Sequence, residues 1–173
     1  MDPIQPSADD FSFLVTTDGP EGTADLGRRA ASLLVGGEII LLYGDLGAGK
    51  TCFAQGLCEG LDVEEDVVSP TFTLVNTYQG RVKVHHLDFY RIEPGDDLGD
   101  IGVPDLLDEV WDGRAVALVE WPAVLLPEFG TQTPRLELLA EPGDSPSDRR
   151  WWLRGVPGTP PAWAELFDQK VER

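Results

Sequence analysis

A run of apolar residues, Ile39 to Leu42, stops at a glycine-rich stretch that is closed by Lys50 and Thr51. Together with Gly44 and Gly49, these two residues fit the pattern G-x-x-x-x-G-K-[ST] of a phosphate-binding loop. Glycines let the backbone wrap an anion without Cβ clashes, so successive amides can point at the phosphates. Lys50 is expected to reach the β- and γ-phosphates, and the Thr51 hydroxyl to bind Mg²⁺. The pattern therefore predicts a nucleoside triphosphate site.

The residues on both sides of this loop fit the strand and the helix that it requires. The run 39–42 is typical of a strand buried on both faces. After the loop, Phe53, Leu57 and Leu61 recur at four-residue spacing, which indicates a helix that packs one face. The start of that helix offers the positive end of its dipole to an anion. The alternative is a structural glycine-rich turn without a ligand, and the context favours the nucleotide site.

The other apolar patterns predict a single α/β domain over residues 1–155. Strands are expected at 11–16, 72–78, 82–88, 115–119, 135–140 and 150–154, and helices at 23–34 and 105–111. Alternation on both sides of Gln79-Gly80 is typical of a β-hairpin. The predicted fold class is a P-loop NTPase three-layer sandwich. Its helices cover a largely parallel sheet that carries an antiparallel hairpin and closing strands.

The two ends of the chain are expected to lie outside this pattern. Residues 1–10 are polar and acidic, and we expect them to be disordered. Residues 156–173 begin as a Pro/Gly-rich linker, and the spacing of Trp163, Leu166 and Phe167 predicts a terminal amphipathic helix over 161–173.

The composition of the chain indicates where the protein is located and which classes of partner are not expected. No apolar run approaches the ~18 residues of a membrane span, and the acidic start lacks the order of a secretory signal, so we expect a cytoplasmic protein with no membrane partner. The net charge of −18 comes from 31 acidic and 13 basic residues. Such a chain repels a phosphate backbone, so direct strong nucleic-acid binding is not expected. The acidity reflects either solubility or a salty cytoplasm, or it forms an acidic patch that docks a basic partner surface.

Two carboxylates end predicted strands, where a P-loop protein needs an acidic group to hold Mg²⁺ or to polarise water. Glu120 follows the apolar run AVALV and is expected at the carboxyl edge of the sheet, near the phosphates. Asp88 ends the alternating segment VKVHHLD. A surface cap is the alternative for both residues, and the buried run before Glu120 favours a functional role there.

Residues beside these carboxylates have simpler alternatives as well. His85 and His86 face opposite sides of a strand, so only His86 shares a face with Asp88, and an orienting hydrogen bond is expected rather than a transition-metal site. Thr71, in Ser69-Pro70-Thr71, is either a sensor of the γ-phosphate or part of a plain turn. Trp121 is either a core aromatic or a lid over the site.

Four motifs in this order resemble the TsaE (YjeE) family of bacterial P-loop ATPases over about residues 20–155. They are GDLGAGKT (44–51), SPTFTLVNTY (69–78), HLDFYR (86–91) and VEWP (119–122). The resemblance implies a role in making N6-threonylcarbamoyladenosine at position 37 of tRNAs that read codons beginning with adenine. It also implies binding of ATP or ADP with Mg²⁺ and weak ATP hydrolysis that the partners TsaD and TsaB stimulate. The threonylcarbamoyl transfer itself would belong to TsaD.

The resemblance assigns roles residue by residue. Lys50, Asp88 and Glu120 would be catalytic, with Asp88 positioning water, and Thr51 and Glu120 would bind Mg²⁺. The nucleotide would be bound by Asp45, Leu46, Gly47, Ala48, Gly49, Lys50, Thr51, Cys52, Thr71, Trp121 and Thr23. Of these, Thr71 would respond to the γ-phosphate, Trp121 would flank the site, and Thr23 would lie near the base.

The chain departs from the family pattern at Cys52, where the family usually has a second Thr, so only the backbone amide there would bind the α-phosphate. An arginine from the closing strands is expected near the adenine, and the sequence does not distinguish Arg149, Arg150 and Arg154. Two other functions remain open. A small nucleotide or nucleoside kinase would need an arginine-bearing lid, and none is visible. A non-catalytic, nucleotide-gated interaction module would need no hydrolysis.

Overall fold

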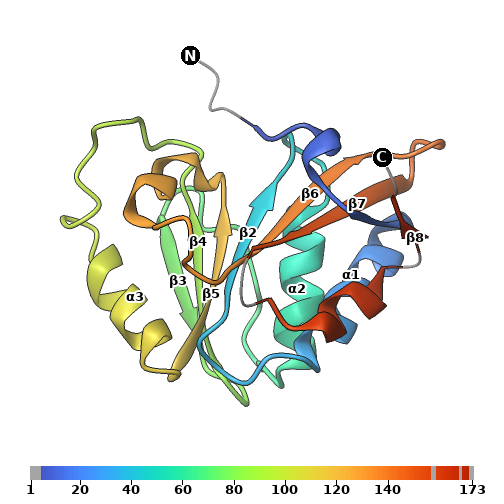
Figure 1. Cartoon of the computed structure of the whole chain (residues 1–173). Coiled ribbons are helices and arrows are strands. Elements are labelled where there is room, and N and C mark those ends of the chain that lie inside the picture. Colours follow the sequence, from blue (N-terminus) through green and yellow to red (C-terminus); the bar gives the residue numbers. More distant parts are fainter. Residues whose placement is uncertain (1–4, 157–158, 168, 172–173) are drawn as a thin grey trace.

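The computed structural model describes residues 5–156, 159–167 and 169–171. Its centre is one eight-stranded sheet in the order β3-β4-β5-β2-β6-β7-β1-β8 (Figure 1). The strands are β1 (Phe13–Asp18), β2 (Ile39–Tyr43), β3 (Val75–Tyr78), β4 (Lys83–Asp88), β5 (Ala115–Glu120), β6 (Leu136–Pro142), β7 (Asp148–Gly155) and β8 (Gln169–Lys170). The helices are α1 (Gly19–Ala31), α2 (Lys50–Gly60) and α3 (Val103–Trp111), with short 3-10 helices at Ala8–Asp10, Pro122–Val124, Leu126–Glu128 and Pro161–Leu166.

The sheet is parallel at its centre and antiparallel on both sides. Strands β4, β5, β2 and β6 pair in parallel. Strand β3 forms the expected antiparallel hairpin with β4. Strand β7 pairs antiparallel with β6, because a short turn rather than a helical crossover joins them. Strand β1 pairs antiparallel with β7 and with β8. The parallel part is the part that carries the glycine-rich loop, so the expected architecture is confirmed where it positions the site.

Helices cover both faces of the sheet, as a three-layer sandwich requires (Figure 1). Along β2, Ile40 and Leu42 pack into the cluster that contains α1 and α2. Ile39 and Leu41 pack into the cluster that contains α3. All four side chains are at most 1% exposed, which explains the uninterrupted apolar run in this strand.

Both ends of the chain differ from the sequence prediction. Disorder over residues 1–10 is wrong for Ala8–Asp10, because Ser7 caps a 3-10 helix there and Phe11 is buried behind it. Residues 1–4 lie outside the described part of the chain.

The predicted helix over 161–173 is wrong as well. A 3-10 helix, Pro161–Leu166, is followed by β8, which pairs with β1. Trp163 and Phe167 are buried in the α1/α2 cluster, so the apolar spacing was a packing signal. The open edge of β1 then offers backbone partners that a helix would not use. Residues 157, 158, 168, 172 and 173 of the predicted tail lie outside the described residues.

Candidate nucleotide-binding site

The loop between β2 and α2 has a backbone that only glycine accommodates at its key positions. Gly44, Gly47 and Gly49 have φ values of 134°, 78° and 105°. A Cβ on Gly44 would also lie 2.6 Å from the carbonyl oxygen of Ala140 in β6. The loop is therefore held against the neighbouring strand, and the glycines of the sequence pattern are required by its conformation.

The side chain of Lys50 turns back over this loop. Its Nζ donates to the carbonyl oxygens of Gly44 and Asp45, at 2.5 and 2.9 Å. The residue is 5% exposed, and this burial lowers the pKa of Lys50, against the opposing effect of the charges of Glu120, Asp88 and Asp45. The chain thus maintains a buried amine directly at the glycine-rich loop.

The two predicted carboxylates come together at the carboxyl edge of the parallel strands. Asp88 and Glu120 are direct partners in the register of β4 and β5, and they are 2% and 3% exposed. Strand parity places both on the face that α2 covers, with Leu118 of the α1/α2 cluster. Glu120 Oε1 lies 2.9 Å from His86 Nε2. Neither carboxylate is the exposed surface cap that was the alternative.

Asp88 is the anchor of the loop that contains Ser69 and Thr71. The hydroxyls of Ser69 and Thr71 donate to Asp88 Oδ2, at 3.0 and 2.9 Å. The backbone amide of Tyr90 donates to Asp88 Oδ1 at 2.9 Å. Thr71 is therefore tied to the carboxylate edge of the sheet, and its response to a γ-phosphate stays a prediction. Ser69 and Tyr90 were not assigned a role from the sequence, and their only signal was membership of the quoted motifs.

Trp121 flanks the same edge and is half-buried. Its ring centroid lies 4.6 Å from Lys50 Nζ and 5.0 Å from the ring of Tyr90. The residue has a left-handed backbone with φ 53°, which turns the chain directly after Glu120. Trp121 also packs against the core cluster that contains α3, so it has contacts with the core and with Lys50, and its role as a lid over the site stays a prediction.

The remaining predicted residues lie around the loop in different environments. Leu46 is 67% exposed at its tip, and Ala48 is buried. Thr51 and Cys52 are half-buried in the first turn of α2. Burial raises the pKa of the other cysteine, Cys58, to about 12, so its thiol stays protonated and inert.

Thr23 and one of the three candidate arginines approach the loop from its other side. The Thr23 hydroxyl is buried and lies 2.8 Å from that of Thr17, and its methyl group lies 3.6 Å from the Cβ position of Gly49. Arg149 Nη2 donates to the carbonyl oxygen of Gly47 at 3.3 Å. Arg150 instead donates to Pro142, and Arg154 is paired with the buried Glu137. Arg149 is therefore the one of the three that contacts the loop, and a contact of any of them with the adenine stays a prediction.

His85 lies on the opposite face of β4, as strand parity predicts. Its ring contacts Thr77 Oγ1 and Glu109 Oε2, each at 2.9 Å. In the described part of the chain, no three His, Cys, Asp or Glu side chains are grouped as a cation site.

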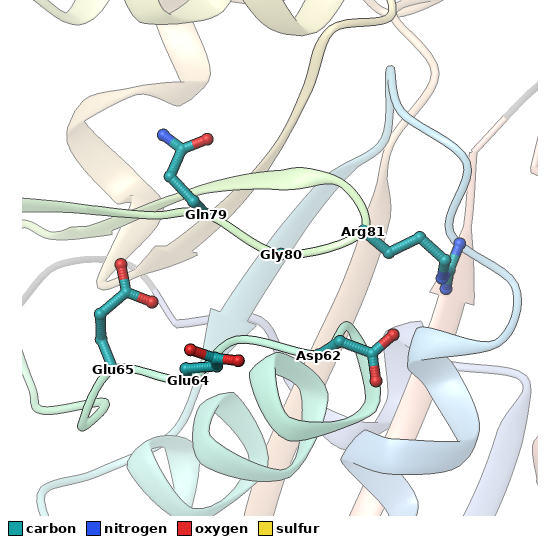
Figure 2. Close-up of a pocket in the computed structure, with 6 residues that line it drawn as sticks. All are labelled: Asp62, Glu64, Glu65, Gln79, Gly80 and Arg81. Carbon is teal, nitrogen blue, oxygen red and sulfur yellow. The ribbon is translucent and has the colours of Figure 1, made fainter.

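A surface depression lies at the other end of α2 and is separate from this site (Figure 2). It is lined by Asp62, Glu64, Glu65, Gln79, Gly80 and Arg81. The guanidinium of Arg81 already has partners, since it donates to the carbonyl oxygens of Ala31, the last residue of α1, and of Leu34. Three carboxylates repel a polyphosphate, so the depression is unsuited to a nucleotide.

The sheet order and the loop between β2 and α2 define an α/β protein of the P-loop class. Residues 17–149 match the family model described as threonylcarbamoyl adenosine biosynthesis protein TsaE, and the chain belongs to this family. The resemblance read from the four motifs is thereby confirmed. No helix in the described ranges is long and apolar enough to cross a membrane.

Similar proteins share most of this domain. A protein of Treponema pallidum named tRNA threonylcarbamoyladenosine biosynthesis protein TsaE is 40% identical over 124 residues, which cover 70% of this chain and 88% of the relative. Proteins of the same name from Nostoc sp. and Bacillus subtilis are 44% and 42% identical, over 58% and 61% of this chain and 62% and 63% of their own length. The crystal structure of Bacillus subtilis YdiB matches with a TM-score of 0.68 at 28% identity, over 90% of both chains.

Proposed function

We propose that this chain binds ATP and hydrolyses its β–γ bond as a component of the machinery that makes N6-threonylcarbamoyladenosine in tRNA. The observation that carries the proposal is the meeting of a buried lysine with two buried carboxylates at a glycine-rich loop. The names of the relatives support a role in the biosynthesis of threonylcarbamoyladenosine in tRNA.

The loop and Lys50 would bind the phosphates. Amides at the loop and at the start of α2 would point at the β-phosphate, and the ammonium would exchange its carbonyl partners for phosphate oxygens. Burial lowers the pKa of Lys50, but its positive form is favoured by Glu120 and Asp88 and would be favoured further by a polyphosphate.

The oxygen donors beside the loop suit Mg²⁺, a hard cation that prefers carboxylate and hydroxyl oxygens. Glu120 and Thr51 would hold it, directly or through water, and bound Mg²⁺ would neutralise charge that develops on the phosphates. Asp88 would position the attacking water. Because Thr71 is bonded to Asp88, a γ-phosphate that attracts Thr71 would change the environment of this carboxylate.

The partners in this proposal are TsaD and TsaB, in the cytoplasm, and the modified tRNAs are those that read codons beginning with adenine. The strong net negative charge supports a division of labour in which this chain handles the nucleotide and TsaD the tRNA. Stimulation of hydrolysis by the partners would follow if docking repositions the loop of Ser69 and Thr71.

A second candidate is a nucleotide-gated interaction module that does not need hydrolysis. It is favoured by the three hydrogen bonds that engage both oxygens of Asp88, which leave this carboxylate poorly placed to activate water. In that case the conformation of the loop with Ser69 and Thr71 would depend on which nucleotide is bound. Threonylcarbamoyladenosine biosynthesis would then require nucleotide binding by this chain but not hydrolysis.

Phosphate release tests these alternatives. We would measure it with no added acceptor, for the chain alone and with purified TsaB–TsaD, in wild type, Lys50→Ala, Glu120→Ala and the exposed control Glu128→Ala. The proposal expects stimulation by the partners, its loss in the first two variants and wild-type rates in the control. No phosphate release in either condition would overturn the ATPase role, and release without stimulation would overturn the role of TsaB–TsaD as partners. If the Glu120→Ala variant replaced the wild-type protein fully in cells although it no longer hydrolysed ATP, the interaction module would be established.

A further inference from the structure

The side chain of His86 is completely buried, yet only one of its two ring nitrogens has a partner. Nε2 lies 2.9 Å from Glu120 Oε1, and Nδ1 is a buried polar atom without a hydrogen-bond partner in the described part of the chain. Packing alone does not require a histidine here, since Val84 and Leu118 on the same face are fully buried apolar residues. A buried polar atom without a partner is costly, so an imidazole at this position indicates a task for its other nitrogen, Nε2.

We propose that His86 is a positioning residue that fixes the Glu120 carboxylate for binding of a Mg²⁺–nucleotide, an inference that rests on the proposed function. An ionised carboxylate only accepts hydrogen bonds, so the ring carries its proton on Nε2 and donates it to Glu120. Among the described residues, no group hydrogen-bonds to the other carboxylate oxygen, Oε2. His86 thus restrains Glu120 through Oε1 and leaves Oε2 for the cation or one of its waters.

The sheet makes this restraint rigid. His86 pairs in register with Leu118, so Glu120 is its diagonal neighbour on the adjacent parallel strand. Both residues belong to central strands, and the hydrogen bond reaches Glu120 from the interior of the protein. Mutation of a group that hydrogen-bonds to a metal ligand typically lowers the affinity for the metal, or the activity, by about 10- to 100-fold, because that group orients the ligand.

The two carboxylates of the site are therefore held in different ways. Asp88 is held by Ser69 and Thr71, which belong to the loop before β3. Glu120 is held by His86, which belongs to the sheet. A change of loop conformation would alter the partners of Asp88 but not those of Glu120. His86 would keep the cation ligand fixed while the neighbouring carboxylate responds to the loop.

Two amide substitutions separate positioning from packing. The Nε2 of Gln can occupy the place of the histidine Nε2, so His86→Gln keeps a donor for Glu120. His86→Asn is the matched control, because it is polar and uncharged but its amide ends near the place of Nδ1. His86→Leu removes both nitrogens and keeps an apolar side chain in the core. Thermal unfolding of each variant shows whether the fold is retained.

The main measurement is ADP affinity by titration calorimetry, with Mg²⁺ and with EDTA. Mg²⁺ should raise the ADP affinity of the wild type, and we expect this increase to be at least about 10-fold smaller in His86→Asn and His86→Leu. In His86→Gln the increase should stay within about threefold of that in the wild type. Affinity in EDTA should be the same in all variants. In a Glu120→Ala background, His86→Asn should cause no further loss.

Wild-type Mg²⁺ enhancement in both His86→Asn and His86→Leu would overturn the proposal, as would a loss in His86→Gln equal to that in His86→Asn. A variant that loses Mg²⁺ enhancement only in proportion to a lowered melting temperature would reveal a structural role instead. These binding measurements do not depend on turnover. Failure of ATP hydrolysis by the wild type would thus defeat the proposed ATPase while leaving the positioning role to be decided by the affinities.

Discussion

The ammonium group of Lys50 lies 4.6 Å from the centroid of the Trp121 ring. Carbonyl oxygens of the loop contact the same ammonium group, so it lies between the loop backbone and an aromatic ring. The left-handed turn at Trp121 places the ring there immediately after Glu120, so one short segment supplies both a carboxylate and a cover for the lysine.

Loss of this cover should raise the pKa of Lys50. Burial is the largest cause that lowers this pKa below its ordinary value of 10.5. Trp121→Ala admits water to the ammonium, so we expect the pKa to move back up, whereas Trp121→Phe keeps a ring and should change it less. The chain has only three lysines, so ¹³C-methylation and NMR titration can resolve Lys50. An equal pKa in the alanine and phenylalanine variants would contradict the role given to the ring.

Asp88→Ala should release the loop that precedes β3. The substitution removes the acceptor for Ser69 and Thr71, and hydrogen bonds to a charged group contribute about 1.5–3 kcal/mol each. We expect the amide of Leu74, bonded to the carbonyl oxygen of Pro70, to exchange with solvent at least about tenfold faster in the ligand-free protein. Thr73→Ala is the control, because that hydroxyl bonds only to the half-buried Asn76 in the described structure and not to Asp88. Equal exchange in the two variants would show that Asp88 does not hold the loop.

Much of this site could be predicted because its determinants are local. Short sequence segments are enough to recognise the apolar run of β2, the glycines of the loop and the alternation along β4. These patterns predict that Lys50, Asp88 and Glu120 lie together, as they do in the structure. Parity also separated His85 from His86, although it did not show that His86 would reach Glu120 on another strand.

Features that depend on distant pairing were missed. The apolar spacing around Trp163 predicts a helix, but the structure of this segment depends on the free edge of β1, with which β8 pairs. The three arginines of β7 could not be ranked because the covered face was unknown. In the structure Arg149 shares a face with Trp151, which packs with α2, whereas Arg150 and Arg154 share the face of Trp152.

Arg149→Met should weaken nucleotide binding more than Arg150→Met does. Only Arg149 of this pair contacts the loop, through the carbonyl oxygen of Gly47. Loss of one partly exposed charged contact costs about 1 kcal/mol, so ADP affinity should fall about fivefold. Titration at two salt concentrations separates direct contact from general charge, since exposed charges are screened by salt. Equal losses in both variants that vanish at high salt would indicate a field effect only.

Acid should destabilise the fold partly through His85. Burial lowers the pKa of His85 below 6.5, against the effect of Glu109 and together with that of Lys83. Below about pH 6.5 the unfolded chain therefore binds more protons than the folded one, and the free energy of unfolding falls as the pH falls. The pKa of Glu109 is also lowered, mainly by its hydrogen bonds with Lys83 and His85, so its own contribution is lost only below its ordinary value of 4.5.

Urea unfolding from pH 8 to pH 5 tests this expectation. The loss between pH 6.5 and 5 should be smaller in His85→Gln, which keeps polar atoms beside Thr77 and Glu109 but cannot gain a proton. The chain has two histidines, and His86 is unchanged in this comparison, so the difference between the two curves isolates His85. Parallel curves over the whole range would exclude the contribution of His85.

Alanine at Gly56 and at Gly22 should have opposite effects on stability. A Cβ at Gly56 in α2 would lie 1.9 Å from the carbonyl oxygen of Ala24 in α1, so the two helices would have to separate. This cost is about 3 kcal/mol or more, which lowers the melting temperature by about 6–12 °C. At Gly22 in α1 the nearest atom is 3.6 Å away, so alanine gains helix propensity of up to about 1 kcal/mol. Thermal unfolding followed by circular dichroism measures both, and a stable Gly56→Ala protein would mean that the α1–α2 contact is not close-packed in solution.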